Sequence, residues 1–419
     1  MRDLHGLPLT TDAAAAEAFN RTLRSYLAYR TDTPQLMKAT LAADPAFALG
    51  HCLMGSLMML AFNRGSVAAA AQAQRNAAKT AAQATAREQM HVRALERWVA
   101  ADVDGALRLW EDILRDHPRD VLALRLSHFN YFWHGRAQEM LACVERLRPH
   151  WSDDLPGWTT LLSCAAFALE ECGDYAAAER AGRQAVALAS DDVWGTHAVA
   201  HVMEMQGRAD EGIAWLGGLE QHWDGKNHFV HHLWWHRALF HLQKREADTV
   251  LELYDRRFRD PASPLCAAIP DLYIDVQNAA SMLFRLERHG VRVGDRWTEL
   301  ADHAEKRIGD CLSTFTLPHW AMALAAAGRD AAAARFVEGM RDYAAGGASN
   351  APTVREVAIP VCLAVIAHRK GEHAAAVDHM RPVLPRLQEL GGSHAQRHVL
   401  QQLFLDAERL RAGNTLQRG

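Results

Sequence analysis

The stretch AFALEECGDYAAAERAGRQAVAL (166–188) decides the fold, because it recurs in altered form as AVAHVMEMQGRADEGIAWLGGL (198–219). Each copy has an apolar segment, then a turn glycine (Gly173 or Gly207), then a small residue five positions later. A helix–turn–helix unit of about 34 residues is typical of tetratricopeptide repeats. Neither helix of such a pair can bury its apolar face alone, so successive pairs stack on one another.

The same turn recurs at Gly135, Gly328 and Gly371 and, in degenerate form, near Arg245. Counted from these turns, the first helices of the repeats are predicted at about 86–101, 120–133, 158–172, 193–206, 229–243, 317–327 and 354–370. Residues 12–80 fit two further, poorly matching pairs. After two glycines the end of the chain predicts a last helix with a capping box formed by Ser393 and Gln396.

No segment alternates apolar and polar residues as a strand would, so the predicted fold is all-α. We expect a tightly curled α-solenoid of tetratricopeptide-like repeats, forming a single superhelical domain over residues 1–419. Its parts are expected to be divergent helices at 1–85, the best-matching repeats at 86–255, an irregular connection with its own helices at 256–316, and further repeats with an end helix at 317–419.

Composition narrows the classes of partner. The 419 residues include 46 lysines and arginines and 50 aspartates and glutamates, for a net charge of −4, which favours neither a nucleic acid nor an anionic membrane as partner. The seven cysteines are scattered and form no C-x-x-C pair, so reduced, mostly buried thiols are expected. The beginning has no signal pattern, and the apolar stretch 52–62 is too short to span a bilayer. We therefore expect a cytoplasmic protein.

Histidine is the unusual residue, with 23 copies against seven tyrosines. Eight of the histidines lie between residues 191 and 245: His197, His201, His222, His228, His231, His232, His236 and His241. His197, His201 and Glu204 precede Gly207 by ten, six and three residues, which places them on one face of a first helix. On the next first helix, His232 and His236 are again four residues apart.

Three interpretations of this cluster stay open. The histidines could perform acid–base chemistry, could hold a divalent metal, or could be hydrogen-bonded fillers among tryptophans. No cofactor is expected, and a metal, if present, would be held by His197, His201, His232 and His236. The candidate catalytic residues are His197, His201, Glu204, His232, His236 and His319. The candidate substrate-binding residues are His394, Arg397, Trp194 and Trp235.

Two smaller motifs lead to weaker expectations. His394 and Arg397 lie in the first turn of the last helix, where free N–H groups and the guanidinium favour an anion. Glu88 and His91 are three residues apart on an early helix, and we expect them on a solvated face.

Several segments resemble the tetratricopeptide-repeat protein 38 family. They include DLHGLPLTT (3–11), HAVAHVMEMQGRADEGIAWL (197–216), HLWWHRALFHL (232–242) and GGSHAQR (391–397), and the resemblance covers nearly the whole chain. It implies an α-solenoid of atypical repeats but no particular reaction. His398 stands where the resemblance would place an aspartate, so a carboxylate partner for the histidines would come from elsewhere, with Asp275 and Asp310 as candidates.

Two functions are compatible with these observations. The favoured one is the binding of a small molecule in a histidine- and tryptophan-rich concave pocket. If the protein is an enzyme, we expect hydrolase- or lyase-type chemistry in that pocket. The alternative is a non-enzymatic scaffold that binds a short peptide in its groove. Neither interpretation involves nucleic acid or a membrane, and a homodimer is compatible with both.

Overall fold

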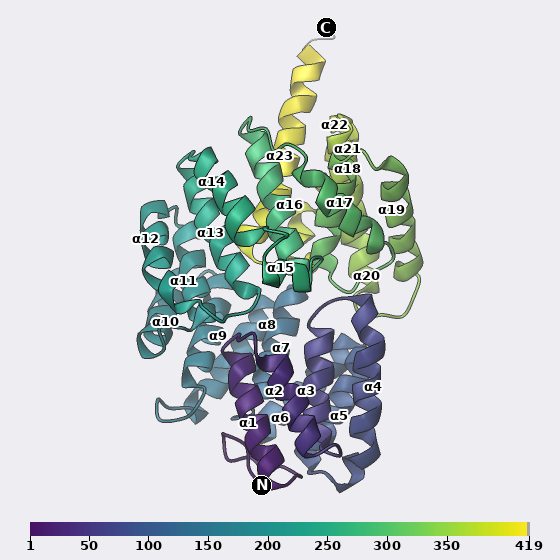
Figure 1. Ribbon diagram of the computed structural model, residues 1–419. Coiled ribbons are helices and arrows are strands. Elements are labelled where there is room, and N and C mark those ends of the chain that lie inside the picture. The colour runs from purple at the N-terminus through teal and green to yellow at the C-terminus, as the bar shows by residue number, and fades with distance from the viewer. Residues whose placement is uncertain (417–419) are drawn as a thin grey trace. The chain divides into compact units, whose positions relative to one another are not determined.

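The computed structural model describes residues 1–416, which are helical along most of their length (Figure 1). Within this range the only extended pairings are two isolated bridges, Arg2 with Pro8 and Arg30 with Lys226. The prediction of an all-α fold is therefore confirmed, and the fold is a solenoid type built from tetratricopeptide-like helical hairpins.

The chain divides into two compact units. The N-terminal unit comprises residues 1–132 and 136–233, and the C-terminal unit comprises residues 133–135 and the chain from 234 onward. The helix that carries His232 and His236 begins in the first unit and continues into the second.

The N-terminal unit is a succession of helical hairpins. Its helices are α1 (Ala13–Leu27), α2 (Thr33–Ala43), α3 (Ala48–Met59), α4 (Arg64–Thr80), α5 (Ala86–Val99), α6 (Val103–Asp116), α7 (Val121–Trp133), α8 (Ala137–Leu147), α9 (Trp158–Glu171), α10 (Tyr175–Leu188), α11 (Val193–Met205), α12 (Ala209–Leu219) and the start of α13 (Phe229–Gln243). Helix α1 packs on α2, α3 on α4, α5 on α6 and α9 on α10. The two divergent pairs expected within residues 12–80 are thus present.

The turns between paired helices depend on left-handed backbone conformations. All five predicted turn glycines have a positive φ: Gly135, Gly173, Gly207, Gly328 and Gly371. Arg245 occupies the same kind of position, with φ 62°, although it is not a glycine. A left-handed conformation is unfavourable for a residue with a Cβ, by roughly 1–2 kcal/mol. The degenerate turn inferred from the sequence is therefore a genuine repeat turn that carries strain.

We expect Arg245→Gly to raise the free energy of unfolding by about 0.5–1 kcal/mol, because glycine relieves this strain and Arg245 is exposed. Urea denaturation followed by circular dichroism would measure the gain. Lys244→Gly is the matched control, since Lys244 is also exposed but does not have a positive φ, and it should not stabilise. A loss of stability in Arg245→Gly would contradict the strain argument.

The C-terminal unit continues the hairpins less regularly. Its elements are α14 (Ala247–Leu253), the π-helical turn η4 (Tyr254–Phe258), α15 (Pro264–Ala268), α16 (Tyr273–Arg288), α17 (Arg296–Lys306), η5 (Thr314–Thr316), α18 (Leu317–Ala326), α19 (Asp330–Ala344), α20 (Ala351–Thr353), the π-helical turn η6 (Val354–Ala358), α21 (Ile359–Arg369), α22 (His373–Met380), η7 (Arg381–Leu390) and α23 (His394–Leu416). The expected irregular connection over 256–316 holds two full-length helices, α16 and α17.

One helical run, Ala351–Arg369, is long and apolar enough by length and composition to cross a membrane. It is longer than the stretch 52–62 that the sequence singled out. The run is 56% buried inside the protein, and a core helix passes the same test. The run is therefore no evidence that the protein crosses a membrane.

Candidate functional site

Helix α11 positions the two histidines of the HAVAHV motif. It begins where the carboxylate of Asp192 accepts hydrogen bonds from the backbone N–H groups of Trp194 and Gly195, at 3.0 and 2.9 Å. An N-cap of this kind fixes the start of a helix and hence the direction of its side chains. The helix packs against α9, α10 and α12. His197 and His201, one turn apart, are consequently both buried.

The imidazoles of His197 and His201 face each other. Their Nε2 atoms are 2.8 Å apart, which is a hydrogen bond in which one nitrogen carries the proton and donates it to the other. Behind His201, the Oε2 atom of Glu170 on α9 lies 3.6 Å from Nδ1. The side chains of His201 and Glu170 are completely buried, so the interaction between the two groups is little screened by water.

His232, on α13, completes a three-histidine cluster with His197 and His201. Its ring centre is 4.9 Å from that of His197 and 6.4 Å from that of His201. One ring nitrogen from each of the three lies within 4.8 Å of the others. The structure thus brings these three predicted residues together within the N-terminal unit.

Aromatic side chains enclose the cluster. The ring of His197 lies 5.3 Å from Phe167, 4.9 Å from Trp194 and 5.1 Å from Phe229, measured between ring centres. These rings exclude water and lower the local dielectric constant, which strengthens every charge interaction inside. Trp194, predicted to bind substrate, is therefore part of the wall around the histidines.

A buried arginine lies on the other side of that wall. The guanidinium carbon of Arg125 is 4.4 Å from the ring centre of Phe129 and 5.4 Å from that of Trp194. Its Nη2 donates a hydrogen bond to the hydroxyl of Tyr29 at 2.5 Å. Burial raises the pKa of Tyr29 well above its usual range, so the phenol stays protonated. Sequence reasoning identified neither Arg125 nor Tyr29.

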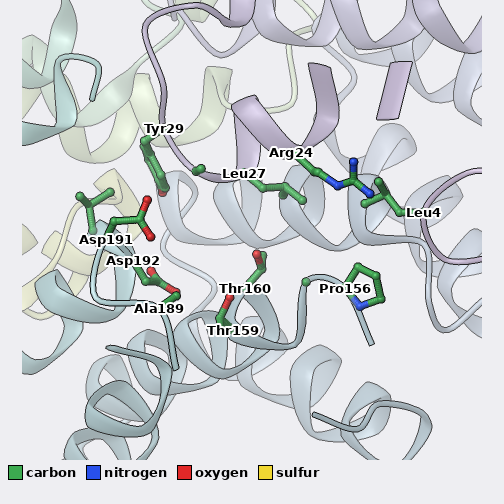
Figure 2. A pocket seen from close by; sticks show the side chains of 13 residues that line it. Leu4, Arg24, Leu27, Tyr29, Pro156, Thr159, Thr160, Ala189, Asp191 and Asp192 are labelled. Carbon is green, nitrogen blue, oxygen red and sulfur yellow. The ribbon is translucent and has the colours of Figure 1, made fainter. Parts of the chain in front are cut away.

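Tyr29 has a strained backbone and borders a cavity. Its φ is 56°, and its carbonyl accepts a hydrogen bond from the N–H of Asn227 at 2.6 Å. The cavity has a volume of about 240 Å³, and Figure 2 shows the side chains around it. It is lined by Leu4, Arg24, Leu27, Ala28, Tyr29, Pro156, Gly157, Thr159, Thr160, Ala189, Asp191, Asp192 and Val193. The Tyr29 ring also lies 6.2 Å from Trp194 and 4.8 Å from Phe229, so one side chain contacts both the cavity and the wall of the cluster.

The structure places a carboxylate beside His201 that sequence spacing did not identify. Spacing favoured Glu204, and the structure brings Glu170 to within 3.6 Å of His201. Both residues stand three positions before a turn glycine, Gly173 for Glu170 and Gly207 for Glu204, so they are equivalent in successive repeats. The imidazole contacts the preceding first helix, and the repeat register was the signal that could have identified Glu170. The two other suggested sources belong to the C-terminal unit: Asp310 lies 3.2 Å from Arg307, and Asp275 is buried on α16.

Two further candidate histidines belong to the C-terminal unit. His236 follows His232 by one turn of α13, and burial next to Arg285 lowers its pKa to about 3. Trp235 packs edge-on against His236, with ring centres 4.9 Å apart. His319, on α18, donates from Nδ1 to the carbonyl of Phe315 at 2.9 Å, and burial lowers its pKa to about 4. Both imidazoles are therefore neutral at physiological pH.

The GGSHAQR segment forms a capped helix start in the C-terminal unit. Ser393 and Gln396 make both bonds of the predicted capping box, at 3.0 and 3.2 Å. Arg397 donates to the carbonyl of Gly392, and the N–H of Arg397 follows the helical pattern to Ser393. His394 is half-buried at the first position of α23. The guanidinium predicted to bind an anion is thus engaged with its own loop.

Glu88 and His91 are buried, so the prediction of a solvated face for them is wrong. Glu88 accepts hydrogen bonds from the N–H and hydroxyl of Thr10, at 3.0 and 2.7 Å. His91 lies 3.0 Å from a carboxylate oxygen of Asp120. These residues anchor the N-terminal segment, whose DLHGLPLTT sequence is among the motifs of the resemblance.

No family model matches the chain. Among solved structures, a human IFIT1 dimer with m7Gppp-AAAA matches with a TM-score of 0.46 and 14% identity, over 98% of this chain and 90% of that chain. The P58(IPK) TPR domain matches with a TM-score of 0.22 and 10% identity, over 96% and 99% of the two chains. The fold class rests on the succession of hairpins described above, and these matches add no argument about ligand or partner.

Proposed function

We propose that this protein binds a small molecule in its N-terminal unit and acts on it at the three-histidine cluster, in a hydrolysis or an elimination. The observation that supports this most is the succession of Glu170, His201 and His197, in which the carboxylate lies 3.6 Å from Nδ1 of His201 and His197 meets its Nε2 at 2.8 Å. A carboxylate beside one imidazole nitrogen, with a proton-donating partner at the other, is how proteins orient and activate a histidine base.

The chemistry follows from the orientation of His201. Glu170 favours a proton on Nδ1 of His201, because a carboxylate stabilises the N–H that faces it. Nε2 is then the basic nitrogen, and it can take a proton from water in a hydrolysis or from carbon in an elimination. The same nitrogen returns that proton to the leaving group, so the imidazole is unchanged after each cycle. The aromatic wall formed by Phe167, Trp194 and Phe229 keeps competing water away.

The cavity beside Tyr29 supports the binding part of the proposal. A volume of about 240 Å³ suits a small ligand, and hydroxyl and carboxylate groups of Thr160 and Asp192 line it next to apolar surface (Figure 2). Tyr29 is also a non-glycine residue held at a positive φ, and such strain is concentrated at functional sites.

Several narrower predictions made from the sequence also remain proposals. They are the membership in the tetratricopeptide-repeat protein 38 family, the cytoplasmic location, the catalytic roles of His236 and His319, and the substrate-binding roles of His394, Arg397 and Trp235. The peptide-scaffold alternative has no specific observation in its favour.

A substrate screen with matched variants tests the proposed function. The purified full-length protein is assayed against a panel of chromogenic esters, amides and phosphate esters and of substrates that eliminate a chromophore. We expect His201→Gln to lower kcat by about 100-fold or more and Glu170→Gln by about tenfold or more, because each removes part of the oriented base.

His128→Gln is the control for the screen. His128 is equally buried and packs against the same rings, Phe167 and Trp194, but it is not one of the three clustered histidines. It should leave kcat within about twofold. Full activity in His201→Gln, or a panel in which no compound is turned over, would overturn the proposal.

A further inference from the structure

The three-histidine cluster has the composition of a transition-metal site. His197 and His201 come from adjacent turns of α11 and His232 from α13, and one nitrogen of each lies within 4.8 Å of the other two. Pairs of histidines four residues apart on a helix present their imidazoles to one point in space. Imidazole nitrogen suits zinc, copper, nickel and cobalt, whereas magnesium and calcium require oxygen ligands.

The ring orientations are also those of metal ligands. His197 and His201 direct the same kind of nitrogen, Nε2, at each other, although only one proton can lie between the two atoms. At 2.8 Å these nitrogens are closer than two ligands of a tetrahedral metal, which are about 3.3 Å apart when each metal–nitrogen bond is about 2.0–2.1 Å. An opening of about 0.5 Å between two side-chain tips would therefore admit an ion in place of the shared proton.

Glu170 supplies the outer support that metal-binding histidines normally have. A ligating imidazole almost always directs its second nitrogen toward a carboxylate or carbonyl, which fixes the ring and raises its basicity. Nδ1 of His201 lies 3.6 Å from the Oε2 atom of Glu170, and the pair is completely buried.

We propose that His197, His201 and His232 bind one divalent ion of the zinc class, with Glu170 as a positioning residue behind His201. The inference rests on the proposed function and deepens it: with its Nε2 nitrogen bound to the ion, His201 would be a ligand, and the ion in place of His201 would activate water at that same site. Three histidine ligands are the number that catalytic zinc sites such as that of carbonic anhydrase use, with water or substrate as the fourth ligand.

Metal binding by the tag-free, full-length protein tests this inference. The protein is freed of metal by dialysis against a chelator and titrated with Co²⁺, whose visible absorption reports nitrogen ligation and tetrahedral geometry. Zn²⁺ is then added in competition with a chromogenic chelator to give its affinity and stoichiometry. We expect one tight site per chain and an intense tetrahedral Co²⁺ spectrum.

Substitutions assign the site. His197→Gln, His201→Gln and His232→Gln should each weaken Zn²⁺ binding by more than about tenfold and change the Co²⁺ spectrum. Glu170→Gln should weaken it by about 10- to 100-fold while leaving the tetrahedral spectrum, as expected for a positioning residue. His128→Gln should bind as the unaltered protein does. Circular dichroism of each variant confirms that it is folded before its affinity is compared.

The outcomes separate this inference from the proposed function. Absence of a tight site, or equal affinity in the three ligand variants and His128→Gln, overturns metal binding. If the metal-free protein still turns over a substrate that His201→Gln does not, the metal inference fails while the proposed function stands. If Zn²⁺ binds at this site but no substrate is turned over, the metal inference stands while the proposed function fails.

Discussion

Replacing Gly391 by alanine is expected to lower the free energy of unfolding of the C-terminal unit by more than about 3 kcal/mol. Gly391 has φ 82° and ψ −163°, a region of backbone conformation that is essentially restricted to glycine. An added Cβ would lie 2.3 Å from the carbonyl oxygen of Trp133, a backbone atom that cannot move by side-chain rotation. The loop would have to shift, and with it the hydrogen bond from the hydroxyl of Thr314 to the carbonyl of Leu390.

Gly371→Ala is the matched control in the same unit, because it introduces backbone strain without a steric clash. Gly371 has φ 77°, but a Cβ there would meet nothing within 4 Å. This control should therefore lose only about 1 kcal/mol, the ordinary penalty of a left-handed alanine. Urea denaturation followed by tryptophan fluorescence would compare the two variants. The collision argument fails if Gly391→Ala is no less stable than Gly371→Ala.

The glycines also explain why the fold could be predicted from the sequence. A left-handed turn between paired helices favours a residue without a Cβ, so Gly173 and Gly207 indicate the register of their repeats in a way that composition alone would not. The same register located the degenerate turn at Arg245, where the structure has the positive φ without the glycine. The residues of GGSHAQR were harder to interpret, because their constraint is the backbone of Trp133, far away in the sequence.

The candidate site was only partly predictable for a related reason. Spacing within one helix placed His197 and His201 on one face, and the structure brings them together. Spacing could not show which neighbouring helix that face meets, so it could not identify Glu170 beside His201. Glu88 was assigned to solvent because its partner Thr10 belongs to a segment without helical periodicity. Contacts between elements, unlike faces of one element, depend on how the hairpins stack.

The second large effect that we predict concerns Asp120, which makes such a contact between elements. Its carboxylate lies 2.7 Å from Nη1 of Arg87 and 3.0 Å from Nε2 of His91, and it caps α7 by accepting from the N–H of Ala123 at 2.9 Å. All three polar side chains are buried. We expect Asp120→Asn to lower the free energy of unfolding at pH 7 by about 3–5 kcal/mol, because it leaves the buried guanidinium without its nearest carboxylate, and that of Asp3 is farther away, at 3.6 Å.

Asp102→Asn is the matched control. Asp102 caps α6 by accepting from the N–H of Gly105 at 2.8 Å, but its ion pair with Arg97 is largely exposed. Asparagine caps a helix about as well as aspartate does, so this variant should lose less than about 1 kcal/mol. A similar loss in the two variants would mean that the buried ion pair of Asp120 contributes nothing beyond its cap.

The pH dependence of stability gives a second check on Asp120. The charges of His91 and Arg87 hold the pKa of its carboxyl far below the usual range despite burial. Because the folded pKa lies below the unfolded value of about 3.9, its stabilising effect is complete above that value and is lost as the pH falls below it. The difference in unfolding free energy between the unaltered protein and Asp120→Asn should therefore be constant from pH 7 to about pH 5 and shrink below about pH 4. A difference that grows as the pH falls would show that the carboxylate is not stabilised in the folded state.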